Sequence, residues 1–311
     1  MRNPRHFLTV SDLRPQEVER LFEMAARGKR DRRISRWALA GKHVALVFQK
    51  PSVRTRVSFE VAIQQLGGSS IYLGPDDAQL DTREPVRDVA RTMSRYVDGI
   101  VVRTFTHSQV EEFARYATVP VINGLSDLHH PCQALADLFT IRERFGRLRG
   151  LTIAYIGDGN NVLHSLAQCA GLLGVNLRSA IPDGYRPDLG IWQQAARLAR
   201  GGRGELILHD DPEEAARGAD VIYTDVWTSM GQERERQARR KAFRGFQVSG
   251  ALLARAKRGC VVMHCLPAHR GEEITDDVLE GPRSIVFDQA ENRLHVQKAL
   301  LLLLFGGTRR R

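Results

Sequence analysis

Residues 43–57 read HVALVFQKPSVRTRV, a stretch that combines an apolar strand, a polar loop and the start of a helix. The run His43–Phe48 is apolar almost throughout, which is typical of a strand buried on both faces in a parallel sheet. We expect a helix over about residues 57–66. A polar loop that enters a helix offers free backbone N–H groups and the positive end of the helix dipole, so this stretch predicts an anion site.

The same alternation of apolar run and helix recurs along the chain in two blocks. Pro85 is followed by apolar residues at helical spacing, and a second helix is expected over Pro131–Phe145, ending at Gly146. This alternation predicts an α/β fold of two domains, each a parallel β-sheet flanked by helices. The remaining expected strands are residues 70–73, 99–103 and 120–122, then 151–156, 176–181, 205–208, 221–224 and 260–264.

Length and composition agree with two domains. The 311 residues predict domains at 1–146 and 147–287, and a last helix within residues 288–311 that packs across the domains or back onto the first. The apolar run 299–305 is too short to cross a bilayer, and the N-terminus has no apolar targeting segment. Four cysteines without a C-x-x-C pair favour the reducing cytoplasm.

The net charge of +10 raises the question of an anionic partner. Arginine is spread along the chain, and dense basic runs occur at residues 234–241 and 309–311. Aromatic residues are sparse around them and no nucleic-acid-binding motif is present, so we expect no nucleic acid. The pattern favours a solvated basic surface and an anion-binding cleft. A nucleic-acid-binding protein is the alternative, and its binding would weaken steeply with salt.

The loop after His43–Phe48 carries the donors that an anion needs. Ser52 and Thr55 add hydroxyl groups, and Arg54 adds a planar fork that suits phosphate oxygens. Arg103 ends a strand and can point into the same cleft. The alternative is a helix cap with surface arginines. The Walker A pattern is absent, which argues against nucleotide hydrolysis.

His130 opens the expected helix at Pro131, and Gln133 lies one turn further on. A histidine there can donate to an oxygen that becomes negative during a reaction, although it could also be a simple helix cap. We expect no metal, because the spacing of the candidate histidine and cysteine ligands fits no usual zinc site. These candidate ligands are His130, Cys132, His264, Cys265 and His269.

Three loops of the second block follow expected strands, where ligands of parallel sheets bind. Residues 156–161, IGDGNN, begin like a dinucleotide fingerprint, but Val162 stands where the third glycine belongs. A dinucleotide-dependent oxidoreductase is the alternative that this loop leaves open. Residues 225–231, DVWTSMG, and 264–270, HCLPAHR, add a carboxylate and a hydroxyl that suit an amino-acid zwitterion. A nucleophilic Cys265 would lack an orienting Asp or Asn in its loop.

Together these segments resemble the aspartate/ornithine carbamoyltransferase family over nearly the whole chain. Residues 52–56, SVRTR, are similar to the family's Ser-Thr-Arg-Thr-Arg motif, and residues 130–133, HPCQ, to its His-Pro-x-Gln motif. Asp225 with the SMG of residues 229–231, and HCLP at 264–267, resemble the ornithine branch. Val53 replaces the family threonine, which removes a hydroxyl near the phosphate.

The resemblance implies a role for each site residue. Arg54, Arg103, His130, Asp225 and Cys265 would be catalytic. Ornithine would be held by Asn161, Asp225, Ser229 and Met230. Carbamoyl phosphate would be held by Ser52, Val53, Arg54, Thr55, Gln79, Arg103, His130, Gln133, Cys265, Leu266 and Arg293.

It also implies the reaction, in which carbamoyl phosphate and L-ornithine give L-citrulline and phosphate with no metal or other cofactor. Domain closure over the substrates is expected by the same analogy. Gln79 and Arg83 match positions that reach a neighbouring subunit's site, which implies a homotrimer or a multiple of trimers with shared active sites. Arginine biosynthesis is the expected setting. The alternative acceptor is another amine, such as putrescine or an acylated ornithine.

Overall fold

The computed structural model describes residues 4–229 and 231–306, and these form two compact units. The first unit contains residues 4–136 and 291–306, and the second contains residues 137–290. Of the two basic runs named above, residues 234–241 are described by the structure, whereas residues 309–311 lie outside the described residues. Among the described helices, none is long and apolar enough to cross a membrane.

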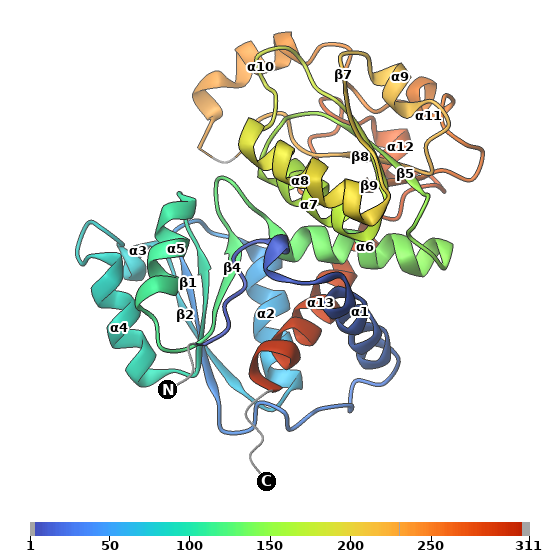
Figure 1. The fold of residues 1–311 in the computed structure, drawn as a ribbon. Helices are drawn as coiled ribbons and strands as arrows, with labels where there is room; N and C mark the ends of the chain where they lie inside the picture. The colour runs from blue at the N-terminus through green and yellow to red at the C-terminus, as the bar shows by residue number, and fades with distance from the viewer. Residues whose placement is uncertain (1–3, 230, 307–311) are drawn as a thin grey trace. The chain divides into compact units, whose positions relative to one another are not determined.

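The first unit is built on a four-stranded sheet with the strand order β2-β1-β3-β4 (Figure 1). All neighbouring strands are parallel, so their carboxyl ends lie at one edge. The strands are β1 (His43–Phe48), β2 (Ser69–Leu73), β3 (Gly99–Arg103) and β4 (Val121–Leu125). Its helices are η1 (Val10–Asp12), α1 (Pro15–Arg30), α2 (Val53–Gln65), α3 (Pro75–Ala78), α4 (Val86–Tyr96) and α5 (His107–Tyr116).

Helices cover both faces of this sheet. In Figure 1, α4 and α5 lie on one side of the strands, and α1 and α2 lie on the other side. One apolar cluster joins Ala45 and Val102 of the strands to Ala90 of α4 and Phe113 of α5. Because both faces are covered, the side chains of β3 are buried along its whole length, which explains its unbroken apolar sequence.

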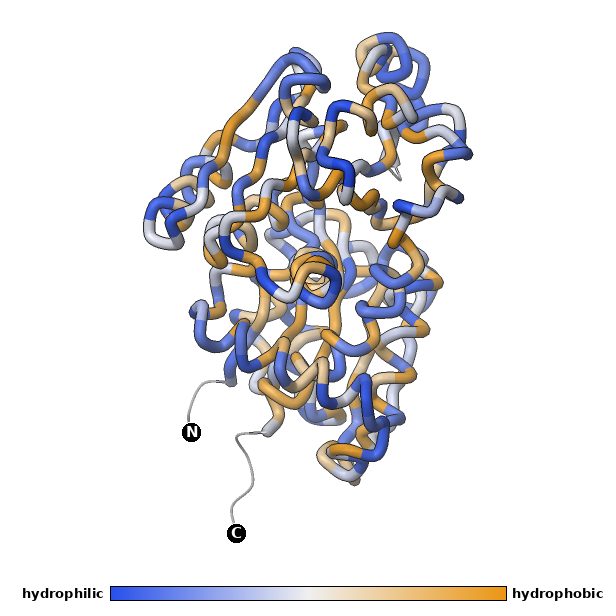
Figure 2. The backbone as a smooth tube through the Cα atoms, turned by 90° about the vertical axis from the view of Figure 1, so that its right-hand side faces the viewer, coloured by the Kyte–Doolittle hydropathy of each residue, from blue (hydrophilic) through white to orange (hydrophobic). Residues whose placement is uncertain are grey.

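The second unit contains a five-stranded parallel sheet with the strand order β7-β6-β5-β8-β9. Its strands are β5 (Thr152–Ile156), β6 (Asn176–Ala180), β7 (Leu206–His209), β8 (Val221–Thr224) and β9 (Val261–His264). Its helices are α7 (Asn161–Leu173), α8 (Leu189–Gly202), α9 (Pro212–Ala216), η2 (Glu233–Glu235), α10 (Arg236–Ala242), α11 (Gly250–Leu253) and α12 (Asp276–Leu279). In Figure 2, orange apolar segments alternate with blue polar ones, because buried elements alternate with exposed turns.

Two long helices carry the chain between the units. Helix α6 (Pro131–Phe145) begins in the first unit, and α13 (Val286–Phe305) returns to it at Glu291. In α13, Lys298 donates to Gln65 of α2 at 3.3 Å. A side chain on Gly99 would meet the Phe305 ring at 2.3 Å, so glycine allows the end of α13 to approach β3.

The predicted fold class, two parallel sheets flanked by helices with a C-terminal helix, is confirmed. The predicted end of the fourth strand is wrong, because β4 continues beyond Ile122 to Leu125. The extension comes from pairing with β3, in which Asn123 lies opposite Val102 and Leu125 lies opposite Arg103 after a shift in register. The N-terminal segment also contacts β4, since the Asn123 backbone N–H donates to the Phe7 carbonyl at 2.8 Å and its side chain donates to the Leu8 carbonyl at 2.9 Å. The division at residues 146 and 287 into functional domains stays a prediction.

Candidate active site

The predicted residues of the first unit gather at the carboxyl ends of three adjacent strands. The loop into α2 follows β1, Arg103 ends β3, and the segment to His130 follows β4. Phe48 and Arg103 are paired in the register of β1 and β3, so the two loops start side by side. Parallel sheets bind ligands at this edge, as the sequence predicts.

Helix α2 starts at Val53, four residues earlier than the expected start at Val57. The cause is the cap at Ser52, whose side-chain oxygen accepts a hydrogen bond from the Thr55 backbone N–H at 3.2 Å. Val53, Arg54 and Thr55 therefore form the first turn, where backbone N–H groups and the positive end of the dipole face outward. The Val53 side chain is 79% exposed.

Arg103 is a buried cation of this cluster. Its side chain is only 7% exposed, and its buried Nε atom has no hydrogen-bond partner within the described part of the chain. Burial, followed by the charges of Arg293 and Arg54, lowers the pKa of Arg103 to about 10. A buried, repelled guanidinium with an unused N–H group is suited to an anionic ligand.

Arg293 reaches the same place from α13. Its guanidinium donates to the Gln133 side-chain oxygen at 2.5 Å and to the Thr55 hydroxyl at 3.0 Å. Thr55, Gln133 and Arg293 are all buried. The structure thus brings together three residues that are up to 238 positions apart in sequence.

His130 is buried beside the same arginines. Burial, then Arg293, Arg103 and Arg54, hold its pKa well below the usual value of 6.5. His130 is therefore neutral at physiological pH and carries one ring proton, which suits a hydrogen-bond donor to an oxygen that becomes negative.

We expect this neutral His130 to make folding sensitive to acid. The unfolded chain binds a proton near pH 6.5 but the folded site resists it, so stability falls below that pH at up to roughly 1.4 kcal/mol per pH unit. Urea unfolding at pH 7.5 and pH 5.5 measures the effect. The parent should lose more stability than His130→Gln over this interval, and equal losses would contradict the assignment.

Gln79 is not part of the cluster within this chain. It lies exposed at the end of α3, with a positive φ of 28°, and its amide donates to the Asp76 carbonyl at 2.8 Å. Arg83 is also exposed. Their roles, which the resemblance assigns to a neighbouring subunit's site, stay predictions.

In the second unit, Asp225 is the centre of a polar cluster at the carboxyl ends of β5, β8 and β9. Its buried carboxylate accepts from the Asn160 side-chain amide at 2.9 Å and from the Cys265 thiol at 2.9 Å. A buried carboxylate held in this way is a suitable acceptor for an ammonium group. The sequence analysis missed Asn160, which is recognisable as the cap of α7 because its side chain accepts from Val162 and Leu163.

Asn161, Ser229 and Leu266 come after β5, β8 and β9, the strands whose carboxyl ends carry the Asp225 cluster. Asn161 is the first residue of α7, and Ser229 follows β8 with its backbone N–H donating to Gln232 at 3.0 Å. Leu266 follows Cys265 with a positive φ of 57°, and its peptide bond to Pro267 is cis. Met230 lies outside the described residues.

Asp225, His264 and Cys265 offer three ligand atoms within 4.8 Å of one another, so a metal site has to be considered. His264 does not fit this role. Its Nδ1 accepts from the Leu266 backbone N–H at 2.9 Å, and its Nε2 faces the buried Glu273 carboxylate at 3.2 Å. Both ring nitrogens are therefore committed to holding the loop, and the cluster is better suited to an organic cation.

In the loop after β5, the protein's own backbone occupies the space next to Gly159. A side chain on Gly159 would lie 2.3 Å from the Pro187 backbone nitrogen and 2.4 Å from the Tyr185 carbonyl. In a dinucleotide fingerprint, the second glycine instead allows the pyrophosphate to approach. This geometry argues against the oxidoreductase alternative.

Comparison with known proteins identifies the family of the chain. Residues 5–143 match the carbamoyl-P binding domain model of aspartate/ornithine carbamoyltransferases, and residues 149–304 match the Asp/Orn binding domain model. An ornithine carbamoyltransferase of Acidothermus cellulolyticus is 56% identical over 302 residues, which is 96% of each chain.

Solved structures give the same result. The ornithine carbamoyltransferase from Pyrococcus furiosus is 51% identical, with a TM-score of 0.95 over 99% of each chain. A mutant N-acetyl-L-ornithine transcarbamylase is 35% identical, with a TM-score of 0.87 over 96% of this chain and 99% of that one. By sequence and structure, the chain belongs to the aspartate/ornithine carbamoyltransferase family.

Proposed function

We propose that this protein transfers the carbamoyl group of carbamoyl phosphate to the δ-amine of L-ornithine, giving L-citrulline and phosphate. The observation that carries the proposal is the arginine cluster of the first unit. Arg54, Arg103 and Arg293 repel one another there, and the buried Nε of Arg103 has no acceptor among the described residues. A phosphate group would supply both negative charge and acceptors.

The Asp225 cluster supports ornithine as the acceptor. Its carboxylate, held by Asn160 and Cys265, would accept the α-ammonium group, and amide groups nearby would bind the carboxylate. The names of the relatives favour the same substrate, since the relative at 56% identity is an ornithine carbamoyltransferase.

The chemistry begins with the δ-amine in its neutral form. An alkyl amine of this kind titrates near pH 10.4, so binding must favour loss of its proton. Its lone pair attacks the carbonyl carbon, and negative charge grows on the carbonyl oxygen. Thr55, Arg103 and neutral His130 would donate to that oxygen. The C–O bond to phosphate then breaks, and the proton that the attacking nitrogen must lose passes to the departing phosphate, which leaves as the hydrogen phosphate dianion. Arg54, Arg103 and the N-terminus of α2 would hold this dianion.

Placing the two reactants in register accounts for a large part of the rate. Each unit holds one substrate in this proposal, and the transfer requires the two bound substrates to meet. The deciding assay measures phosphate and citrulline release from carbamoyl phosphate with L-ornithine, putrescine or N-acetyl-L-ornithine. Ornithine should give the highest kcat/KM. If the enzyme preferred putrescine or N-acetyl-L-ornithine, that amine would replace ornithine as the proposed acceptor, and the proposed carbamoyl phosphate site would be unaffected.

Val53→Thr should strengthen carbamoyl phosphate binding. The side chain at this position is 79% exposed in the first turn of α2, so a threonine hydroxyl fits without repacking and adds a hydrogen bond to a charged group. Such a bond should lower KM for carbamoyl phosphate by about tenfold. Val53→Ala is the control for the loss of the valine methyl groups. An unchanged KM in the threonine variant would mean that a neighbour already fills the role.

The wider setting is part of the proposal. We place the enzyme in the cytoplasm and in arginine biosynthesis, and no disulfide joins its four cysteines, all of which lie in the described residues. We also propose a homotrimer in which Gln79 and Arg83 complete the site of a neighbouring subunit. Light scattering gives the assembly mass. Mixed Arg54→Ala and Arg83→Ala subunits should regain activity if sites are shared.

A further inference from the structure

We infer that Arg239 is a positioning residue for ornithine binding, because it ties together the loops that carry the ornithine-binding residues. This inference rests on the proposed function of the Asp225 cluster. Arg239 belongs to the basic run 234–241, which the sequence analysis interprets as solvated surface. The structure overturns this interpretation at one position, because Arg239 is 6% exposed while the other members of the run are exposed.

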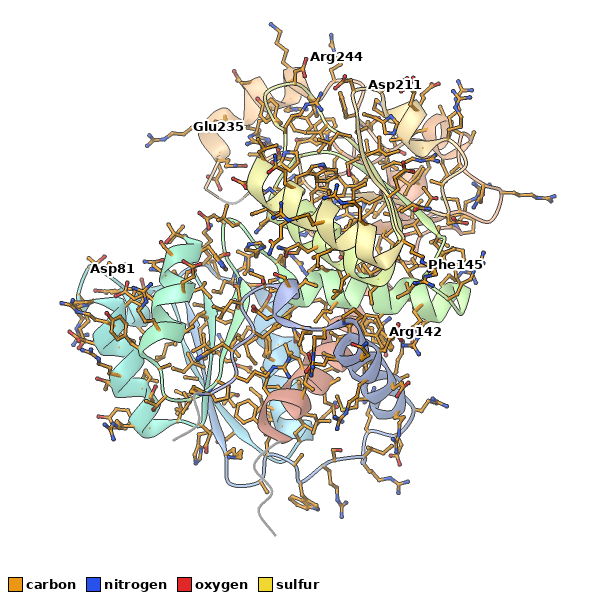
Figure 3. All side chains as sticks on the ribbon, in the orientation of Figure 1. Asp81, Arg142, Phe145, Asp211, Glu235 and Arg244 are labelled. Atoms are coloured by element: carbon orange, nitrogen blue, oxygen red, sulfur yellow. The ribbon has the colours of Figure 1, made fainter. Side chains whose placement is uncertain are left out.

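Three hydrogen bonds fix the Arg239 guanidinium. One nitrogen donates both to the Asp158 carboxylate and to the Trp227 carbonyl, each at 2.9 Å, and Nε donates to Glu235 at 3.0 Å. The guanidinium carbon also lies 4.8 Å from the centre of the Tyr185 ring. Figure 3 labels Glu235, which immediately precedes α10.

These contacts come from loops after three adjacent strands. Asp158 follows β5, Trp227 follows β8, and Tyr185 follows β6. The Tyr185 carbonyl in turn accepts from the Gly159 backbone N–H at 2.9 Å. Arginine is suited to this position because its planar fork can hold several acceptors in fixed directions.

The link from Arg239 to the ornithine site is short. Asp158 lies two residues before Asn160, and the Tyr155 hydroxyl donates to the Asp158 carbonyl at 3.0 Å and lies 3.4 Å from the Asn160 side-chain oxygen. Asn160 then donates to Asp225 at 2.9 Å. The position of Asp158 therefore sets the position of the amide that orients the Asp225 carboxylate.

Arg239 also holds both ends of the loop that carries Ser229. The Trp227 carbonyl lies at the start of this loop and Glu235 at its end. Within it, the Gly231 backbone N–H donates to Glu233 at 2.9 Å, so the loop depends partly on local bonds. Without Arg239, the loop would keep these local bonds but lose its attachment to Asp158.

Burial raises the pKa of Asp158 to about 6, and Arg239 acts in the opposite direction. Removing only one partner would therefore leave a buried charge that destabilises the fold. The test needs variants that keep the charge or remove both charges. Arg239→Lys keeps the charge but cannot hold all acceptors in the same geometry, and the double variant Arg239→Met/Asp158→Asn removes both charges.

We expect KM for ornithine to rise by about tenfold in both variants, while KM for carbamoyl phosphate changes by less than about twofold. Binding of L-norvaline, which keeps the α-ammonium and carboxylate of ornithine but lacks the δ-amine, should weaken equally in calorimetry with carbamoyl phosphate present. Arg240→Met is the matched control, because Arg240 is an exposed neighbour on the same helix, 3.8 Å from Glu272. It should match the parent.

Two outcomes would overturn the inference. One is an unchanged KM for ornithine in a folded double variant. The other is an equal rise of KM for both substrates together with a lower melting temperature, which would indicate a purely structural pair. Failure of the proposed function looks different, because the parent enzyme itself would then not carbamoylate ornithine.

Discussion

Arg54→Ala should lower kcat/KM by at least about 10³-fold, because it removes a proposed donor to the leaving phosphate and a charge that acts on Arg103. The same variant should be as stable as the parent or slightly more stable. Arg54 repels Arg103, and its removal leaves the pKa of Arg103 closer to its usual value. Loss of activity without loss of stability separates a ligand-binding arginine from a structural one.

Steady-state kinetics and thermal unfolding of the same preparation test this prediction. Arg56→Ala is the matched control, since Arg56 lies on the same helix, pairs with Glu60 at 3.0 Å and stacks 3.7 Å from the Tyr72 ring centre. It should keep most of its activity. Carbamoyl phosphate should raise the melting temperature of the parent and of Arg56→Ala but not of Arg54→Ala. Near-parental kinetics in Arg54→Ala would remove the phosphate assignment.

Asp225→Asn should raise KM for ornithine by about 10²-fold, because the proposed charge-assisted bond to the ammonium group would become a neutral one. The asparagine has the same shape, and its carbonyl oxygen can still accept from Asn160 or Cys265. The fold should therefore survive. Carbamoyl phosphate binding, measured by calorimetry, should be unchanged, because the arginines predicted to hold the phosphate are in the other unit.

Asp211→Asn is the control for this variant. Asp211 is an exposed cap of α9 whose side chain accepts from Glu213 at 2.9 Å, and asparagine caps helices equally well (Figure 3). It should behave as the parent does. If Asp225→Asn weakened both substrates to the same extent, Asp225 would be a structural residue and the acceptor site would have to be sought elsewhere.

Much of the arginine cluster of the first unit was predictable because its signal is local. Ser52, Arg54 and Thr55 are consecutive or nearly so, and they follow an apolar run that only a buried parallel strand explains well. The rule that ligands bind at strand carboxyl ends then also selects Arg103 and His130. Arg293 is different: only the family resemblance pointed to it, because its partner Thr55 is 238 residues away.

Errors at the element ends also have local or distant causes. Helix α2 starts at Val53 because Ser52 caps it. This cap is a local signal, but the sequence analysis did not use it and predicted the helix start too late. The extra length of β4 depends on pairing with β3, in which Leu125 lies opposite Arg103 after a shift in register that no property of residues 121–125 reveals.

Patterns along the chain were enough to predict the two parallel sheets, the strand-end loops and the residue types that suit a phosphate and an amino acid. Periodicity and capping act over a few neighbouring residues, so they are visible in the chain without its fold. The folded structure was needed to show which of the arginines in residues 234–241 is buried, and that Asn160 contacts Asp225. This burial and this contact depend on the fold, which brings charged groups and backbone atoms from distant parts of the sequence within about 3 Å of one another. The bonds of Arg239 to Asp158 and Trp227 are examples.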